Sequence, residues 1–121
     1  MLLDLDFSSS IPIYMQIRNK IVLAIANGEL ENGEKLPTIR SLADEIGINM
    51  MTVSKAYQLL KSEGYIITDR RSGASVSYKK ENTKYSKETL EDLKLKIAEL
   101  KISGVSYEEL IDLLKKIYEE V

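Results

Sequence analysis

Two short segments with helical periodicity meet at a turn around Gly47, and this pattern constrains the fold more than any other feature of the chain. Thr38 is a suitable N-cap for the first segment, and Gly47 is a suitable stop for it. Asn49 is a suitable N-cap for the second segment, which continues to Gly64. Their apolar positions are Ile39, Leu42, Ala43 and Ile46 in the first, and Val53, Ala56, Tyr57, Leu59 and Leu60 in the second. Two helices joined by about three or four residues are what a helix-turn-helix requires.

The residues on either side of this pair add a helix and a hairpin. Residues 12–26 carry apolar side chains mostly at three- and four-residue spacing, with Ser10 as the expected N-cap and Gly28 as the expected stop. The stretch GELENGEKLP is then expected to be an irregular connection. After the second helix of the pair, YIIT and SVSY flank the turn sequence DRRSGA, a pattern typical of a β-hairpin. Together these elements predict a winged helix-turn-helix over residues 1–78.

The end of the chain predicts two amphipathic helices. Residues 79–85 are mostly charged or polar, without apolar periodicity, and are expected to form a linker. Gly104 can close the first helix, and Ser106 with Glu109 is expected to make a capping box for the second. Their apolar stripes consist of Leu90, Leu93, Ile97 and Leu100, and of Leu110, Leu114, Ile117 and Val121. A short chain buries a modest fraction of its surface, so we expect residues 86–121 to be a two-helix dimerisation segment. The predicted fold class is α+β, mainly α.

The net charge of −2 hides a gradient along the chain. Residues 35–80 hold eight Lys or Arg against four acidic residues, whereas residues 81–121 hold seven Lys against ten acidic residues. The winged helix-turn-helix is therefore locally basic, and the tail is acidic. The net charge of the surface that meets a nucleic acid matters more for binding than the net charge of the whole chain.

Several classes of function are disfavoured by what the chain lacks. It has no Cys and no His, so it offers neither disulfides nor the usual transition-metal ligands, and we expect no cofactor and no metal. An enzyme is disfavoured further, because there is no phosphate-cradling Gly-rich motif and no carboxylate pair in a recognisable setting. The N-terminus, MLLDLDFSSS, carries acids where a secretory signal carries Lys or Arg, and no apolar run approaches membrane-spanning length. We therefore expect a cytoplasmic protein with no membrane partner.

The candidate DNA contacts follow from how a helix-turn-helix works. Its second helix enters the major groove with its first turns against the base edges, while the end of the preceding helix touches phosphates. Thr38 and Arg40 stand where a helix N-terminus and a guanidinium can hold a phosphate together. The hairpin tip offers guanidinium groups to the minor groove or the DNA backbone. The predicted set is Thr38, Arg40, Asn49, Met51, Thr52, Ser54, Lys55, Arg70, Arg71 and Gly73.

These residues also carry a resemblance to a known family. The segments that carry it are PIYMQI (residues 12–17), GEL (28–30), GEKLPTIRSLA (33–43), TVSKAY (52–57), EGYI (63–66) and the wing at 73–76. In order and spacing they resemble the DNA-binding domain of GntR-family regulators over about residues 11–77, and the two-helix tail is similar to the YtrA-type branch of that family. The resemblance implies a homodimer on a palindromic double-stranded operator, with Arg40, Thr52 and the wing among the contacts. It also implies targets such as transporter operons, usually under repression.

Two positions depart from the pattern of that family. Many relatives place Arg or Pro at position 50, where Met50 cannot donate a hydrogen bond to guanine. Relatives often have the first wing glycine at position 71, where this chain has Arg71. Both departures bear on which bases are read and on the conformation of the wing.

The residues leave one other class of function open. Winged helices also serve as protein-interaction adaptors, and an acidic tail can bind a partner protein. A tail of about forty residues is too short to enclose a typical metabolite pocket by itself. A cleft at a dimer interface is then the place for a small-molecule effector, which the residues do not identify.

Overall fold

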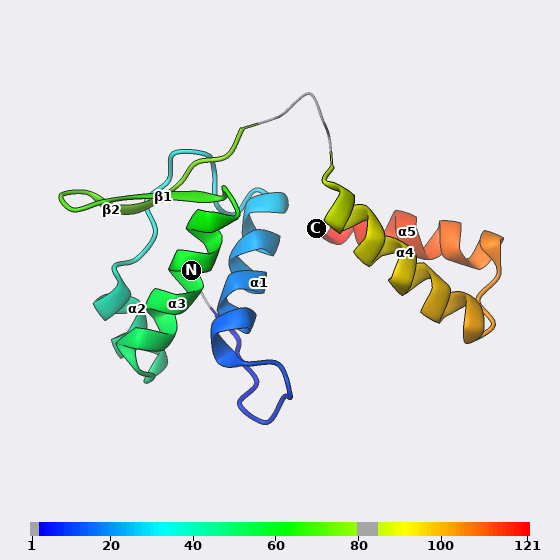
Figure 1. Cartoon of the computed structure of the whole chain (residues 1–121), viewed down its shortest axis with the longest axis horizontal. Coiled ribbons are helices and arrows are strands. Elements are labelled where there is room, and N and C mark those ends of the chain that lie inside the picture. The colour runs from blue at the N-terminus through cyan, green and yellow to red at the C-terminus, as the bar shows by residue number, and fades with distance from the viewer. Residues whose placement is uncertain (1–2, 80–84) are drawn as a thin grey trace. The chain divides into compact units, whose positions relative to one another are not determined.

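The computed structural model describes residues 3–79 and 85–121. Its elements in chain order are α1 (Ile13–Ala26), α2 (Ile39–Ile46), α3 (Met50–Ser62), β1 (Ile66–Asp69), β2 (Gly73–Val76), α4 (Lys87–Ile102) and α5 (Tyr107–Glu120), as labelled in Figure 1. The mainly helical α+β fold class is confirmed. The chain divides into an N-terminal unit, Met1–Lys79, and a C-terminal unit, Lys80–Val121. Most of the predicted linker, residues 80–84, lies outside the described residues.

One hydrophobic core holds the N-terminal unit together, and α1, α2, α3 and both strands contribute to it. Its largest side chains with less than 2% exposure are Ile17, Ile21, Leu42, Val53, Leu60, Ile66 and Val76. α3 packs against α1, α2 and β1, so it is the central element of the unit. This burial stabilises the unit by about 1.5–3 kcal/mol for each fully buried side chain of this size.

The two helices of the helix-turn-helix begin and end where the sequence predicts. Thr38 Oγ1 accepts a hydrogen bond from the Ser41 N–H at 3.0 Å, and Asn49 Oδ1 accepts one from the Met51 N–H at 2.7 Å. Gly47 ends α2 in a left-handed conformation with φ of 82°, which glycine adopts without the steric cost that a Cβ brings. The three residues 47–49 therefore form a rigid turn between the two helices.

The start of α1 is not capped as predicted. The N-cap position is Pro12, with no side-chain cap, so the expectation for Ser10 is wrong. Gln16 instead ties the preceding arm down: its side-chain amide donates to the carbonyls of Asp6 and Ile11, each at 2.8 Å. The same amide accepts from the Asp6 N–H at 2.8 Å. These bonds hold the arm against α1, but they do not cap the free N–H groups of its first turn.

The wing is an antiparallel hairpin with a three-residue loop. Ile66 pairs with Val76 and Asp69 with Gly73, so residues 70–72 form the tip. Gly73 has a φ of 76°, and the Asp69 carboxylate accepts a hydrogen bond from the Arg71 N–H at 3.0 Å. Among the described residues a positive φ occurs only at glycines. Arg71 therefore occupies ordinary backbone, and Gly73 alone supplies the left-handed residue that this loop requires.

The segment before α2 was expected to be irregular, and this is only partly correct. The Leu36 N–H donates to the Ala74 carbonyl at 2.9 Å, and the Val76 N–H donates to the Glu34 carbonyl at 2.8 Å. Lys35 consequently lies opposite Ser75 in an antiparallel bridge. A short third strand segment thus pairs with β2, which neither its length nor its composition predicts.

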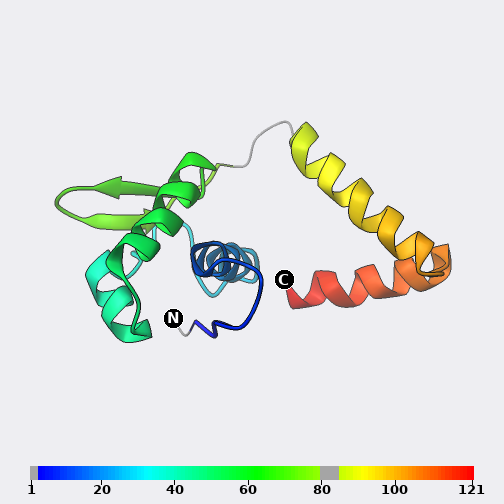
Figure 2. The same cartoon turned by 60° about the horizontal axis from the view of Figure 1, so that its bottom comes forward.

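The C-terminal unit consists of two capped helices. Ser86 and Ser106 are the N-caps, and their hydroxyls accept from the N–H groups of Thr89 at 3.0 Å and Glu109 at 3.1 Å. Gly104, with φ of 94°, closes the turn between the helices, as predicted. Figure 2 shows α4 and α5 meeting at this turn and diverging toward their other ends. Neither helix contains a buried residue, so this pair has no core of its own in a single chain.

Candidate nucleic-acid interface

The first turn of α2 presents a helix N-terminus with a basic side chain beside it. Thr38 caps the helix, and the side chains of Thr38 and Arg40 are both exposed. A helix N-terminus carries a partial positive charge, and a guanidinium donates several hydrogen bonds in a plane. This pair has the chemistry to hold a phosphate, as the sequence predicts.

Tyr57 connects α3 to the residue before this cap. Its hydroxyl donates to the Pro37 carbonyl at 2.7 Å, and its side chain is buried. Burial raises the pKa of this phenol, so it stays protonated and remains a donor. The bond fixes the entry to α2 against the recognition helix, α3, and therefore sets where Thr38 stands.

The recognition helix has one buried face and one outward face. The buried face consists of Val53, Ala56, Tyr57 and Leu60. At 100° per residue, the positions opposite this face are Met51, Lys55, Gln58 and Ser62, all exposed. Met51 is 78% exposed, which makes its side chain the most exposed large apolar group in α3.

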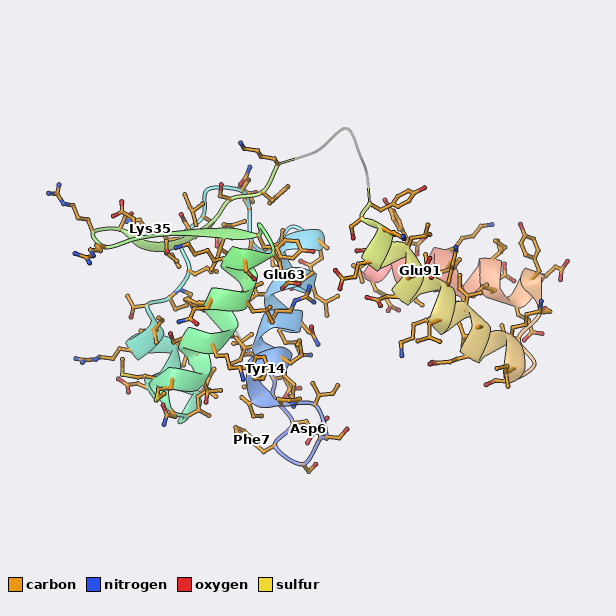
Figure 3. The ribbon with its side chains drawn as sticks, viewed as in Figure 1. Asp6, Phe7, Tyr14, Lys35, Glu63 and Glu91 are labelled. Atoms are coloured by element: carbon orange, nitrogen blue, oxygen red, sulfur yellow. The ribbon has the colours of Figure 1, made fainter. Side chains whose placement is uncertain are left out.

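Two polar side chains on or beside the outward face already have partners within the chain. The Lys55 ammonium lies 4.1 Å from the centroid of the Tyr14 ring, and Figure 3 labels Tyr14 on α1 beside α3. The Gln58 amide donates to the Ser54 hydroxyl at 3.3 Å. These contacts restrict side chains that would otherwise lose conformational entropy on binding DNA.

The wing adds further positive charge. Arg70 and Arg71 are exposed at the tip, and Lys35, labelled in Figure 3 beside the hairpin, is exposed next to β2. Figures 1 and 2 both show the hairpin tip and α2 on the side of the N-terminal unit away from α1. The structure therefore brings the wing and the start of α2 to one side of this unit.

An acidic residue of the basic segment is paired on the opposite side of the unit. The Arg18 guanidinium donates two hydrogen bonds to the Glu63 carboxylate, at 2.9 and 2.8 Å. Figure 3 labels Glu63 at the end of α3. The hydrogen bonds that Arg18 donates to the Glu63 carboxylate raise the pKa of Arg18. Because Glu63 is paired with a residue of α1, its negative charge subtracts little from the positive field at the wing and the start of α2.

All ten predicted DNA contacts lie within the described residues, and none is buried. The exposed ones are Thr38, Arg40, Asn49, Met51, Lys55, Arg70 and Arg71, and the half-buried ones are Thr52, Ser54 and Gly73. Sequence reasoning omitted Lys35 and Gln58. A signal existed for Gln58, which stands seven residues after Met51 on the same helical face. No local signal existed for Lys35, because its place follows from pairing with β2.

The predicted dimerisation residues form an uncovered apolar surface on α4 and α5. Leu90, Ile97, Leu100 and Leu110 are half-buried, and Leu93, Leu114 and Ile117 are 49%, 40% and 42% exposed. Ile97, Leu100 and Leu110 line a cleft where the two helices meet. Apolar side chains at this exposure carry a free-energy cost in water that a partner surface would remove.

Two further classes of site were searched for in the described part of the chain. Within residues 3–79 and 85–121, no group of three or more His, Cys, Asp or Glu residues is arranged to hold a metal ion. None of the described helices is long and apolar enough to cross a membrane.

Comparison with known proteins places this arrangement in a family context. The family described as "Bacterial regulatory proteins, gntR family" matches residues 13–76, from α1 to the end of β2. The HTH-type transcriptional repressor YtrA of Bacillus subtilis is 37% identical over 99% of this chain and 95% of its own length. These proteins are transcriptional regulators rather than enzymes.

Solved structures resemble both units. A protein of Listeria monocytogenes EGD-e described as a transcriptional antiterminator has a TM-score of 0.86 and 36% identity, covering 97% of this chain and 90% of its own. The DNA-binding domain of AraR in complex with operator ORX1 has a TM-score of 0.57 and 26% identity, covering 62% of this chain and 96% of its own. The AraR structure is therefore that of a DNA-binding domain bound to an operator.

Proposed function

The chain belongs to the GntR family of DNA-binding transcriptional regulators, and we propose that it is a repressor that binds a palindromic double-stranded operator as a homodimer. The observation that carries this proposal is the set of exposed polar and basic groups at the first turns of α2 and α3 and at the wing. It is supported by the name of the B. subtilis relative, a transcriptional repressor. We further propose that the protein works in the cytoplasm, where its DNA is.

In this proposal each set of exposed residues makes one kind of contact with DNA. The N-cap and first two turns of α3, from Asn49 to Lys55, read base edges in the major groove, because recognition helices enter it with their N-terminal residues. The start of α2 and the tip of the wing hold phosphates through Thr38, Arg40, Arg70 and Arg71. Phosphate contacts carry most of the affinity and base contacts carry the specificity.

The dimer supplies the second half-site. The uncovered stripes of α4 and α5 pack against the same stripes of a second copy, which is the self-complementary contact of a two-fold dimer. Two recognition helices at a fixed separation then require two half-sites related by the same symmetry. Repression follows when such a dimer occupies a site that overlaps a promoter.

Selection of bound sequences from a random duplex pool tests the proposal. We expect enrichment of two inverted half-sites at constant spacing, with affinity that falls steeply with salt. The genomic positions of the enriched site would then tell whether transporter operons are among the targets. Repeating the selection with cell-extract metabolites would reveal an effector, because a bound effector changes the enrichment.

The alternative, a winged-helix adaptor without specific DNA readout, predicts a different outcome of the same experiment. An adaptor would bind the pool weakly, and no sequence would be enriched. The exposed apolar surface of α4 and α5 would then be a docking site for a different protein, and the purified chain would be a monomer.

A further inference from the structure

The most exposed large apolar side chain of the recognition helix lies among the proposed base-reading residues, and the group that it contacts on a base remains to be assigned. Met51 is 78% exposed on the outward face of α3, and its neighbour Met50 is 43% exposed. Both lie in the first turn, the part of a recognition helix that meets base edges. A thioether is at best a weak hydrogen-bond acceptor, so neither side chain can read the donors and acceptors of a guanine or an adenine.

The surroundings of Met51 leave its apolar surface free for a ligand. The N–H of Met51 is held by the Asn49 side chain at 2.7 Å, which fixes the backbone of the first turn. Four residues further along the outward face, the Lys55 ammonium is held over the Tyr14 ring at 4.1 Å. The backbone of this turn is therefore fixed while the Met51 side chain points into solvent.

The major groove offers one common apolar group, the 5-methyl group of thymine. Methionine suits such a contact, because its unbranched, polarisable side chain adapts to the shape of what it covers. Resting on the proposed function, we propose that Met51 determines base specificity by packing on a thymine 5-methyl group in each half-site. Met50, less exposed, lies beside this contact.

Replacing thymine by uracil tests the inference, because the substitution removes the methyl group and leaves base pairing unchanged. The probe is the duplex enriched by this chain from the random pool, synthesised with deoxyuridine at one thymidine position at a time in each half-site. Binding of the full chain is measured at one fixed salt concentration. We expect at least one position at which the loss of the methyl group weakens binding about fourfold, the equivalent of one buried methyl or methylene group.

Variants of α3 then show whether Met51 makes that contact. Met51→Ala is expected to bind the thymine duplex more weakly and to lose the difference between thymine and uracil at that position. Met51→Leu keeps an apolar side chain and is expected to retain the difference. Gln58→Ala, on the same outward face, is the matched control and should also retain it. Both substituted positions, Met51 and Gln58, are exposed, so the fold is expected to be unaffected by the three variants.

Four results would count against the inference, and only the last of them also counts against the proposed function. If deoxyuridine is tolerated at every position, or if Met51→Ala keeps the full difference, Met51 does not read a methyl group and the proposed function still stands. An enriched site without any thymine facing α3 has the same meaning. If the pool enriches no sequence at all, the proposed function and this inference fall together.

Discussion

The N-terminal and C-terminal units both contain amphipathic helices, but they differ in whether the apolar side chains of these helices are buried. The N-terminal unit encloses fourteen buried hydrophobic residues, from Ile17 to Val76. The described part of the C-terminal unit, residues 85–121, encloses none, although α4 and α5 carry regular apolar stripes and good caps. Two helices that have caps and apolar stripes but no buried core depend on contact with another surface for their stability.

This contrast assigns the two units different physical roles. The N-terminal unit is stable through its own packing and can therefore hold Thr38, Arg40 and the first turn of α3 in a fixed geometry. In the proposed dimer the C-terminal unit gains most of its stability from association, so we expect its folding to depend on protein concentration. We therefore expect that the stability of the N-terminal unit and the proposed dimerisation can be changed separately by mutation.

The largest effect is expected in the core of the N-terminal unit. Leu60→Ala should lower its free energy of unfolding by about 2–5 kcal/mol, because it removes a fully buried side chain and leaves a cavity. Urea denaturation followed by circular dichroism measures this, and the loss should not depend on protein concentration. Lys61→Ala, an exposed neighbour, is the control and should change stability by less than about 0.5 kcal/mol. A similar loss in both variants would mean that the core does not govern this unit.

A charge in the apolar stripe of the C-terminal unit should act through association instead. Leu114→Asp is expected to convert the dimer to a monomer and to weaken operator binding at least about a hundredfold, because the second half-site is no longer held by the same molecule. Sedimentation and a binding titration measure the two effects. Asp112→Ala, an exposed change on the opposite side of α5, should alter neither. Dimers of unchanged strength in Leu114→Asp would place the interface elsewhere.

A smaller effect is expected at the phosphate site of α2. Arg40→Ala should weaken operator binding by about 1–3 kcal/mol and reduce the salt dependence by about one phosphate contact, without unfolding the protein. Lys20→Ala, an exposed lysine on α1, is the matched control and should leave both quantities unchanged. Undiminished affinity of Arg40→Ala would remove Arg40 from the interface.

The smallest effect concerns the bond between α3 and the entry to α2. Tyr57→Phe should lower the free energy of unfolding by about 1 kcal/mol, since the Pro37 carbonyl loses a buried donor. We expect operator binding to weaken as well, because Thr38 is no longer fixed against the recognition helix. Tyr118→Phe removes a hydroxyl from a ring that is 82% exposed, and it should have no effect on stability. Equal stability of the two variants would show that the Tyr57 hydroxyl is not a structural contact.

Features that depend on neighbouring residues could be predicted from the sequence, and those that depend on distant residues could not. The caps at Thr38 and Asn49 and the stop at Gly47 follow from local side-chain and backbone chemistry, and all three are confirmed. Ser10 was wrong because α1 begins only at Ile13, which places the N-cap position at Pro12. The segment around Lys35 was missed because it pairs with β2, which lies about forty residues later.

The candidate site divides in the same way. Exposure of Arg40 and Met51 follows from helical periodicity, so it could be predicted. The partner of the Tyr57 hydroxyl, twenty residues away, could not. Which of the ten predicted residues contact DNA stays a prediction, because that depends on a duplex as well as on the chain.

The division of labour between the two units is tested most directly by sedimentation equilibrium of the full chain and of residues 1–79, with circular dichroism of both. We predict a dimer for the full chain and a monomer for residues 1–79 that keeps its helical signal and unfolds cooperatively. A dimer of residues 1–79, or a full chain that stays monomeric at micromolar concentration, would contradict the account.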